Sequence, residues 1–363
     1  MLGAQRLGAA VVVDVVVAAG GQHALQVAEI DDAAVIVVGG IPVVALLVAV
    51  DPRIGDVRAA EAVTAGRRGE VTSVVAVGGG SVMDLGKAAA ALIPGTRGIM
   101  DHLEGVGQGA PLSHAPLPMV AIPTTAGTGA EVTKNAVIGV PEAGRKVSLR
   151  DDRMLPRLAI VDPSLTDNAP RGITLASGLD AITQVIEPYL SRRANPLTDA
   201  LCAQAIPMGL RALLTLLNSE DAEARDQMAY TSLMGGLALA NAGLGAVHGF
   251  AGVIGGRFDA PHGALCGRLL PPVLTENRAA LADADAAGSD ARAFGQHIVQ
   301  TYIEYIKELK ATDSFSPTPF EEEARRMTWL QEWALVGGGE PQSEMDRDLA
   351  LRVPQLLARQ AAV

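Results

Sequence analysis

The first 165 residues alternate between short apolar runs and stretches rich in alanine and glycine. The runs are rich in valine and isoleucine, which is typical of buried strands. They cover residues 34–38, 44–50, 74–77, 119–122 and 158–161. Strands that alternate with helical stretches form parallel sheets with helices on their faces. This pattern predicts an α/β domain in the first part of the chain.

The pattern changes after Asp162 and Pro163. The later segments are long and rich in alanine, leucine, methionine and glutamine, which favours helices. They cover residues 173–191, 196–217, 222–243 and 292–309. We therefore predict an α/β domain over residues 1–164 and an all-helical domain over residues 165–363. A cleft between two such domains is a common place for a small-molecule site.

Length and composition limit the possible functions. A chain of 363 residues is long enough for about two domains. Its apolar fraction of 49% excludes a disordered regulator, because such chains lack the apolar area that offsets chain entropy. The net charge of −11 repels nucleic acids and anionic lipids. We therefore expect neither a nucleic acid nor a membrane as a partner.

Two apolar segments near the N-terminus resemble targeting or membrane signals. In the first, Asp14 interrupts the apolar stretch and Arg6 is the charge that precedes it, which argues against an export signal. The second, residues 33–50, is long enough for a membrane span, but Gly39, Gly40 and Pro42 interrupt it. Two buried segments that meet at a turn explain this run better. Because the chain has only two cysteines, a reducing compartment and hence the cytoplasm is expected.

A glycine-rich turn follows the apolar run at residues 74–77. Gly78, Gly79 and Gly80 end this run, and Ser81 then opens a helical stretch. Glycines at such a turn let backbone amides and the positive end of a helix approach a phosphate. The spacing up to Lys87 does not match the loop of nucleotide triphosphatases. Phosphate binding and an ordinary tight turn both remain open for this segment.

A second polar segment follows the apolar run at residues 119–122. It contains three threonines, Thr124, Thr125 and Thr128, together with two glycines. Hydroxyl and amide donors after a buried strand gather at the edge of an α/β sheet where ligands bind. A solvated loop is the alternative. Lysines are rare in this chain, yet Lys146 and two others fall in or near these segments.

Four further residues suggest a metal site. Asp180 and Gln184 are four positions apart, which places them on one face of a helix. His248 and His262 lie farther along in apolar, glycine-rich surroundings. Imidazole and carboxylate ligands suit Zn²⁺ or Fe²⁺. The alternatives are hydrogen-bonded core histidines and a helix-capping role for Asp180.

Five blocks together resemble the iron-containing alcohol dehydrogenase family. Their order and spacing over about 200 residues make the resemblance specific. The blocks are GGGSVMDLGK (78–87), PTTAGTGAEVTKNAVI (123–138), KVSLR (146–150), GLDAITQVIEPYLS (178–191) and GLGAVHGFAGVIGGRFDAPHG (243–263). The resemblance implies a dinucleotide-binding α/β domain, an all-helical domain, one divalent metal (iron or zinc) in the cleft, and a homodimer.

The resemblance also implies roles for individual residues. Gly79, Gly80 and Ser81 match the positions that hold the coenzyme pyrophosphate. Thr124, Thr125 and Thr128 match positions that line the nucleotide, and Lys146 matches one on the nicotinamide side. Asp180, His248 and His262 match three metal-ligand positions.

The chain departs from the family pattern at several positions. Members usually have histidine where this chain has Gln184 and, near the substrate, where it has Gly252. An amide oxygen is a weaker, neutral ligand, but three strong ligands still suffice for a catalytic zinc. No side chain is identified as a catalytic base, so water or the coenzyme ribose is expected to carry the proton. NAD-preferring members tend to have an acidic residue where this chain has Gly39 and Gly40. Its absence weakly favours NADP, and both NAD and NADP remain open.

The resemblance implies hydride transfer between a nicotinamide coenzyme and a small alcohol, aldehyde or ketone, with the metal as Lewis acid. One alternative is a metal-independent enzyme similar to the maleylacetate reductases. Another is a nucleotide-binding family member without catalytic activity. A lyase similar to dehydroquinate synthase would need a basic phosphate pocket, and the sequence offers no clear one.

Overall fold

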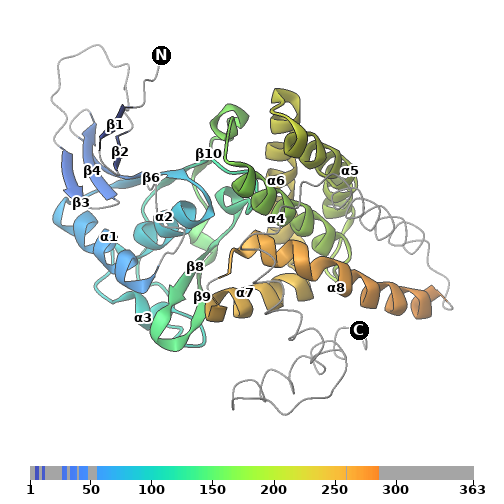
Figure 1. Cartoon of the computed structure of the whole chain (residues 1–363). Helices are drawn as coiled ribbons and strands as arrows, with labels where there is room; N and C mark the ends of the chain where they lie inside the picture. Colours follow the sequence, from blue (N-terminus) through green and yellow to red (C-terminus); the bar gives the residue numbers. More distant parts are fainter. Residues whose placement is uncertain are drawn as a thin grey trace.

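The computed structural model describes the backbone of residues 5–7, 10–12, 27–30, 33–38, 41–47, 55–258 and 260–285, and the side chains of residues 55–256 and 260–277. Within these ranges an α/β part and a helical part lie side by side (Figure 1). The predicted fold class is therefore confirmed. The helix predicted at residues 292–309, and Gly39 and Gly40, lie outside the described residues. The boundary at residues 164 and 165 stays a prediction.

The main sheet has six strands in the order β10-β7-β6-β5-β4-β3. Its strands are β3 (Val27–Ile30), β4 (Ala33–Val38), β5 (Ile41–Leu47), β6 (Ser73–Gly78), β7 (Met119–Pro123) and β10 (Leu158–Ala159). Strands β10, β7, β6 and β5 are parallel, whereas β4 and β3 are antiparallel to their neighbours.

The prediction for the sheet needs one correction. The apolar run at residues 33–50 forms β4 and β5, which pair antiparallel with Val38 opposite Ile41. A connection of two residues can join only antiparallel strands, since a parallel pair needs a long crossover. The strand predicted at residues 44–50 is observed at Ile41–Leu47. One edge of the sheet is therefore antiparallel.

Three helices accompany this sheet: α1 (Asp56–Arg68), α2 (Gly80–Leu92) and α3 (Ile99–His102). The side chains of β6 alternate between buried and half-buried, as expected for a strand inside a sheet. Helix α2 packs on β6 and β7 with a run of buried alanines. A Cβ added to its Gly86 would lie 2.9 Å from the Cβ of Ala76. This close packing fixes the first turn of α2 at the end of β6.

Two hairpins and four short 3-10 helices complete the α/β part. The hairpins are β1 (Gln5–Leu7) with β2 (Ala10–Val12), and β8 (Asn135–Val140) with β9 (Arg145–Arg150). The 3-10 helices are η1 (Ala130–Val132), η2 (Pro141–Ala143), η3 (Asp152–Met154) and η4 (Pro163–Thr166). The β8–β9 hairpin contacts α2 on one side and α7 of the helical part on the other. It therefore bridges the two parts.

The helical part contains α4 (Arg171–Tyr189), α5 (Pro196–Asn218), α6 (Ala222–Ala242), α7 (Ala246–Phe258) and α8 (His262–Asp285). Asn195 and Asp221 cap α5 and α6 by accepting hydrogen bonds from backbone amides of the first turns. Residues 178–188 of α4 are all buried, which makes α4 the central helix. Polar side chains on this stretch, Asp180 among them, therefore lie inside the core and need partners there.

Among the described helices, α5 is long and apolar enough to cross a membrane, and α6 with α7 would pass the same test as one sharply bent span. Half of the most apolar window of α5 is buried in the protein. Its Cys202, Ile206 and Leu213 belong to the core that α5 shares with α4 and α6. The length and apolar composition of α5 would suit a membrane span, but they equally suit a helix of the protein core.

Candidate functional site

The glycine turn, residues 78–80, joins the end of β6 to the start of α2. Gly79 is the N-cap and carries no side chain that could occupy the amides of the first helical turn. Ser81 is the second residue of α2 and is half-buried. The turn therefore has the strand, turn and helix arrangement that the sequence predicts for phosphate binding.

The threonine loop, residues 123–131, lies directly against this turn. The backbone amide of Thr124 donates a 2.9 Å hydrogen bond to the carbonyl of Gly78. A Cβ on Gly79 would lie 3.3 Å from Thr125 Oγ1, and a Cβ on Gly80 would lie 2.6 Å from Thr128 Cγ2. The structure thus brings together the glycines and threonines that the sequence assigns to the coenzyme.

The other face of the threonine loop packs on the helical part. A Cβ on Gly127 would lie 2.9 Å from Ser177 Cβ of α4. Gly129 has a left-handed backbone (φ +56°), and a Cβ there would lie 2.6 Å from the Cα of Gly236 in α6. Glycine is needed at position 129 for both the backbone angle and the space. The loop is held between the glycine turn and helices α4 and α6.

Lys146 lies on β9, where the β8–β9 hairpin meets α7. A Cβ added to Gly256 of α7 would lie 2.7 Å from the backbone nitrogen of Lys146. Helix α7 therefore approaches the strand closely. Its positive charge acts on His262 and helps to lower the pKa of that imidazole. The structure therefore places Lys146 within electrostatic reach of the predicted metal ligands.

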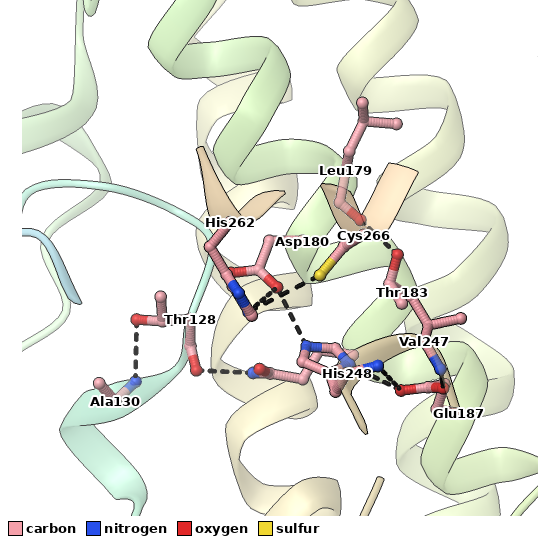
Figure 2. Close-up of polar contacts among 11 residues, drawn as sticks. Thr128, Ala130, Leu179, Asp180, Thr183, Glu187, Val247, His248, His262 and Cys266 are labelled. Carbon is pink, nitrogen blue, oxygen red and sulfur yellow. Dashed lines mark hydrogen bonds and ion pairs between the residues drawn. The ribbon is translucent and has the colours of Figure 1, made fainter. Parts of the chain in front are cut away.

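Asp180, His248 and His262 converge although 82 residues separate the first from the last along the chain. Together with Cys266 they form a candidate metal group: one ligand atom from each lies within 4.8 Å of the others. Asp180 comes from α4, His248 from α7, and His262 and Cys266 from α8 (Figure 2). Asp180 Oδ1 is 3.2 Å from His248 Nε2 and 3.8 Å from His262 Nε2.

The charges of the candidate metal group are coupled. Burial opposes ionisation of Asp180, but the two imidazoles outweigh it and lower the pKa of the carboxyl group. Burial likewise opposes a charge on His248, yet interactions with Cys266, Asp180 and Glu187 give its imidazole a pKa well above the usual value. Burial, together with the charges of His248 and Lys146, lowers the pKa of His262. The group contains an ionised carboxylate beside two imidazoles, which is a suitable environment for a cation.

Glu187 holds His248 from behind. Its Oε2 lies 2.6 Å from His248 Nδ1, and its Oε1 accepts a 2.7 Å hydrogen bond from the backbone amide of Val247 (Figure 2). Both side chains are largely buried. Because Nδ1 is engaged by Glu187, His248 presents Nε2 to Asp180. A carboxylate behind a metal-binding histidine fixes the tautomer and the orientation of the ring.

Gln184 lies one turn after Asp180 on α4, as its spacing predicts, and is buried. Its side-chain Nε2 donates a 2.7 Å hydrogen bond to the backbone carbonyl of Thr128. Gln184 therefore links α4 to the threonine loop. The role of Gln184 as a metal ligand stays a prediction.

Gly252 lies one turn after His248 on α7, where the resemblance leads one to expect a histidine. A Cβ at Gly252 would meet no described atom within 4 Å. The position is half-buried and leaves space open on the helix face that also carries His248.

Two further residues of the site, Cys266 and Glu187, are not among those predicted from the sequence. Their spacing carries a signal, since Cys266 is four residues after His262 and Glu187 is seven after Asp180. Both intervals place two side chains on one face of a helix. In the sequence, the number of cysteines indicates only the redox compartment.

Comparison with known proteins agrees with this arrangement. Residues 16–163 match the iron-containing alcohol dehydrogenase family, and residues 174–314 match the C-terminal part of the Fe-containing alcohol dehydrogenase family. The 1,3-propanediol dehydrogenase of Klebsiella pneumoniae is 37% identical over 237 residues, which cover 64% of this chain and 60% of that enzyme.

Two solved structures have similar folds. A 1,3-propanediol oxidoreductase superposes with a TM-score of 0.66 at 29% identity, covering 86% of this chain and 82% of the other. The sulfoacetaldehyde reductase of Bifidobacterium kashiwanohense, solved in complex with NAD+, gives a TM-score of 0.61 at 30% identity over 70% of this chain and 69% of the other. The two family matches together span most of the sequence and include both the glycine turn and the candidate metal group. This chain therefore belongs to the iron-containing alcohol dehydrogenase family.

Proposed function

We propose that this protein is an NAD-dependent oxidoreductase that interconverts a small alcohol and its aldehyde or ketone, with one divalent metal ion held by Asp180, His248 and His262. The observation that carries the proposal is the convergence of Asp180, His248 and His262 from three helices next to the coenzyme segments. The similarity to 1,3-propanediol enzymes supports the reaction class. The similarity to a reductase solved with NAD+ and to an NAD-dependent methanol dehydrogenase supports the choice of NAD.

The residues present fit a divalent metal. The candidate metal group offers one carboxylate, two imidazoles and one thiol, which are the side chains that bind zinc and related ions. Asp180 is ionised because its pKa is lowered, and Glu187 orients the ring of His248 through Nδ1. When bound, the metal supplies Lewis acidity toward an alcohol or carbonyl oxygen, and the nicotinamide supplies or accepts the hydride.

The protein itself supplies orientation. The glycine turn offers backbone amides at the start of α2 for the coenzyme pyrophosphate, and the threonine loop supplies hydroxyls beside it. Gln184 ties that loop to α4, one turn from Asp180. The coenzyme segments and the candidate metal group are thus held at a fixed distance by direct contacts, which is what hydride transfer between two bound groups requires.

Position 252 is a glycine, so it offers no side chain that could act as a base. An added Cβ there would meet no described atom within 4 Å. We propose that the proton of the alcohol leaves through water or through the coenzyme ribose. Assembly as a homodimer and a cytoplasmic location stay predictions.

Metal analysis combined with a coenzyme assay tests this function. Protein purified without chelator is expected to contain about one divalent metal per chain and to reduce NAD+ in the presence of a short-chain alcohol. His262→Ala is expected to lose metal and turnover together, because it removes one ligand. The control is His114→Ala. His114 is exposed, lies outside the candidate metal group, and its ring forms a hydrogen bond with the neighbouring Ser113. No turnover of any alcohol, aldehyde or keto acid by the wild type would refute the proposal, and full activity of His262→Ala would refute the ligand assignment.

A further inference from the structure

The distances in the candidate metal group can be compared with the geometry of a zinc site. Four ligands around tetrahedral zinc lie about 3.3 Å apart for a nitrogen and an oxygen, and about 3.6 Å apart for a nitrogen and a sulfur. The carboxylate Oδ1 of Asp180 lies 3.2 and 3.8 Å from the Nε2 atoms of the two histidines. Cys266 Sγ lies 3.7 Å from His262 Nε2. The thiol therefore lies close enough to the other three side chains to serve as a fourth ligand.

Helix α8 fixes this position. His262 and Cys266 are four residues apart, so both side chains lie on the same face, one turn above the other. Cys266 is fully buried, and its neighbour Gly267 packs against Leu179 of α4. The sulfur is thus held by the core of the helical part and has little freedom to turn away from Asp180 and the histidines.

Gln184, in contrast, is engaged outside the group. A backbone carbonyl can only accept a hydrogen bond, so the NH2 end of the Gln184 amide must face Thr128, at 2.7 Å. Only Oε1 of the amide is then left as a possible ligand atom, and a neutral amide oxygen is a weaker ligand than a thiolate. A Cβ added to Gly235 of α6 would lie 3.4 Å from the Gln184 side chain. Helix α6 therefore packs against this side chain and helps to hold it in place. Gln184 stabilises the threonine loop in this arrangement.

We propose that Cys266, and not Gln184, completes the metal coordination of this protein, and that the resulting Asp–His–His–Cys set selects zinc over iron. The inference rests on the proposed metal site and specifies its fourth ligand and its metal. A thiolate is a soft ligand that favours zinc, and zinc lies above iron in the general order of divalent affinities. Zinc can expand to five ligands, so an alcohol oxygen still finds a coordination position.

The binding step involves one proton. Burial raises the pKa of the Cys266 thiol to about 12, so the sulfur is protonated in the metal-free protein at neutral pH. On binding, the sulfur–metal bond forms, the S–H bond breaks and the proton passes to water. No electron changes hands, since zinc is not redox active. Coordination provides the driving force, because a thiol bound to a metal loses its proton outright.

Cobalt substitution tests the fourth ligand. Metal-free protein is loaded with one equivalent of Co²⁺, and the near-ultraviolet spectrum is recorded for the sulfur-to-cobalt charge-transfer band. The chain has two cysteines, Cys202 in the core of α5 and Cys266. Cys202→Ala, the matched control, is expected to keep the band, which can then arise only from Cys266. Cys266→Ser is expected to lose the band, and Gln184→Leu, which offers no ligand atom, is expected to keep it.

The wild-type spectrum decides the matter even if a variant does not fold. A band in wild type and in Cys202→Ala supports the inference. Bound cobalt that shows only visible d–d bands overturns the inference while leaving the proposed metal site intact. Failure of the wild type to bind any cobalt overturns both. In competition between Zn²⁺ and Fe²⁺ under anaerobic conditions, both proteins are expected to prefer zinc, and the preference of wild type is expected to exceed that of Cys266→Ser about tenfold or more. Equal preference in the two proteins would overturn the zinc selectivity.

Discussion

Glu187 contacts both the imidazole and the backbone at one metal-ligand position: its two oxygens lie 2.6 Å from His248 Nδ1 and 2.7 Å from the amide nitrogen of Val247. The same carboxylate therefore fixes the ring of His248 and the first turn of α7, which carries it. A Cβ on Gly245 would lie 2.7 Å from Glu187 Oε1, so the chain also needs a glycine just before this turn.

Replacement of Glu187 by glutamine is expected to weaken metal binding. The amide keeps the size of the side chain but provides only one acceptor, so one of its two contacts is lost. Loss of a carboxylate behind a metal-binding histidine reduces metal affinity about 10- to 100-fold. Competition of wild type and variant with a coloured chelator for Zn²⁺ measures the change. The control is Glu223→Gln, an exposed residue in the first turn of α6. Equal affinities of Glu187→Gln and the control would contradict the role of Glu187.

The metal-free protein is expected to show an unusual titration of His248. Its pKa is raised above 6.5, because interactions with Cys266, Asp180 and Glu187 together outweigh the effect of burial. Its protonation therefore stabilises the fold fully below pH 6.5, and this stabilisation is lost as the pH rises through the raised pKa. The ring-proton shifts of the six histidines in NMR spectra, with His248→Gln used for assignment, report the value. Glu187→Gln should lower the pKa of His248; an unchanged value would show that the carboxylate is not its partner.

The apolar pattern alone predicts the two-part architecture of this chain. Short valine-rich runs and long alanine-rich segments carry their structural preference locally, so each element can be read without knowledge of its neighbours. The antiparallel strand β4 was missed because its sequence is as apolar as that of a parallel strand. Only the length of its connection to β5 distinguishes the two, and residues 33–50 contain no charge to mark where one strand ends.

The candidate site shows where sequence reasoning ends. Spacing places Asp180 and Gln184 on one face of α4, and the structure shows both there. Spacing does not reveal that Gln184 meets the carbonyl of Thr128, 56 residues away, because that contact depends on how the threonine loop packs against α4. Cys266 is a similar case. A buried cysteine is usually a small core residue, and only the convergence of three helices places its sulfur beside two histidines.

A methyl group at Gly80 is expected to weaken coenzyme binding. Its Cβ would lie 2.6 Å from Thr128 Cγ2, so Gly80→Ala must move the threonine loop away from the glycine turn. Because the loop also packs against α4 and α6, this shift is expected to lower the stability as well. The expected result is a Kd for NAD+ that rises about tenfold with a lower melting temperature, measured by calorimetry and thermal unfolding. Gly172→Ala in the first turn of α4, where an added Cβ meets no described atom, should change neither.

The close contact between the threonine loop and α6 can be measured with two matched glycines. Gly129 and Gly144 have the same left-handed backbone, with φ of +56° and +57°. A Cβ on Gly144 meets no described atom, whereas one on Gly129 would lie 2.6 Å from the Cα of Gly236. Gly144→Ala should therefore lower the free energy of unfolding by the backbone cost alone, about 1 kcal/mol. Gly129→Ala should lower it by a further 1–3 kcal/mol or so, because backbone atoms on both sides must separate.

Urea unfolding of the metal-free proteins gives both values, and binding of NAD+ to the folded variants separates packing from function. Because the threonine loop lies between α6 and the glycine turn, Gly129→Ala should also weaken NAD+ binding, while Gly144→Ala, at the far end of the β8–β9 hairpin, should leave it unchanged. Equal losses of stability in the two variants would mean that the loop can move away from α6 at no cost. In that case the contact between Gly129 and α6 would not hold the threonine loop in place. The hydrogen bond of Gln184 to Thr128 would then be the contact left to position the loop against the helical part.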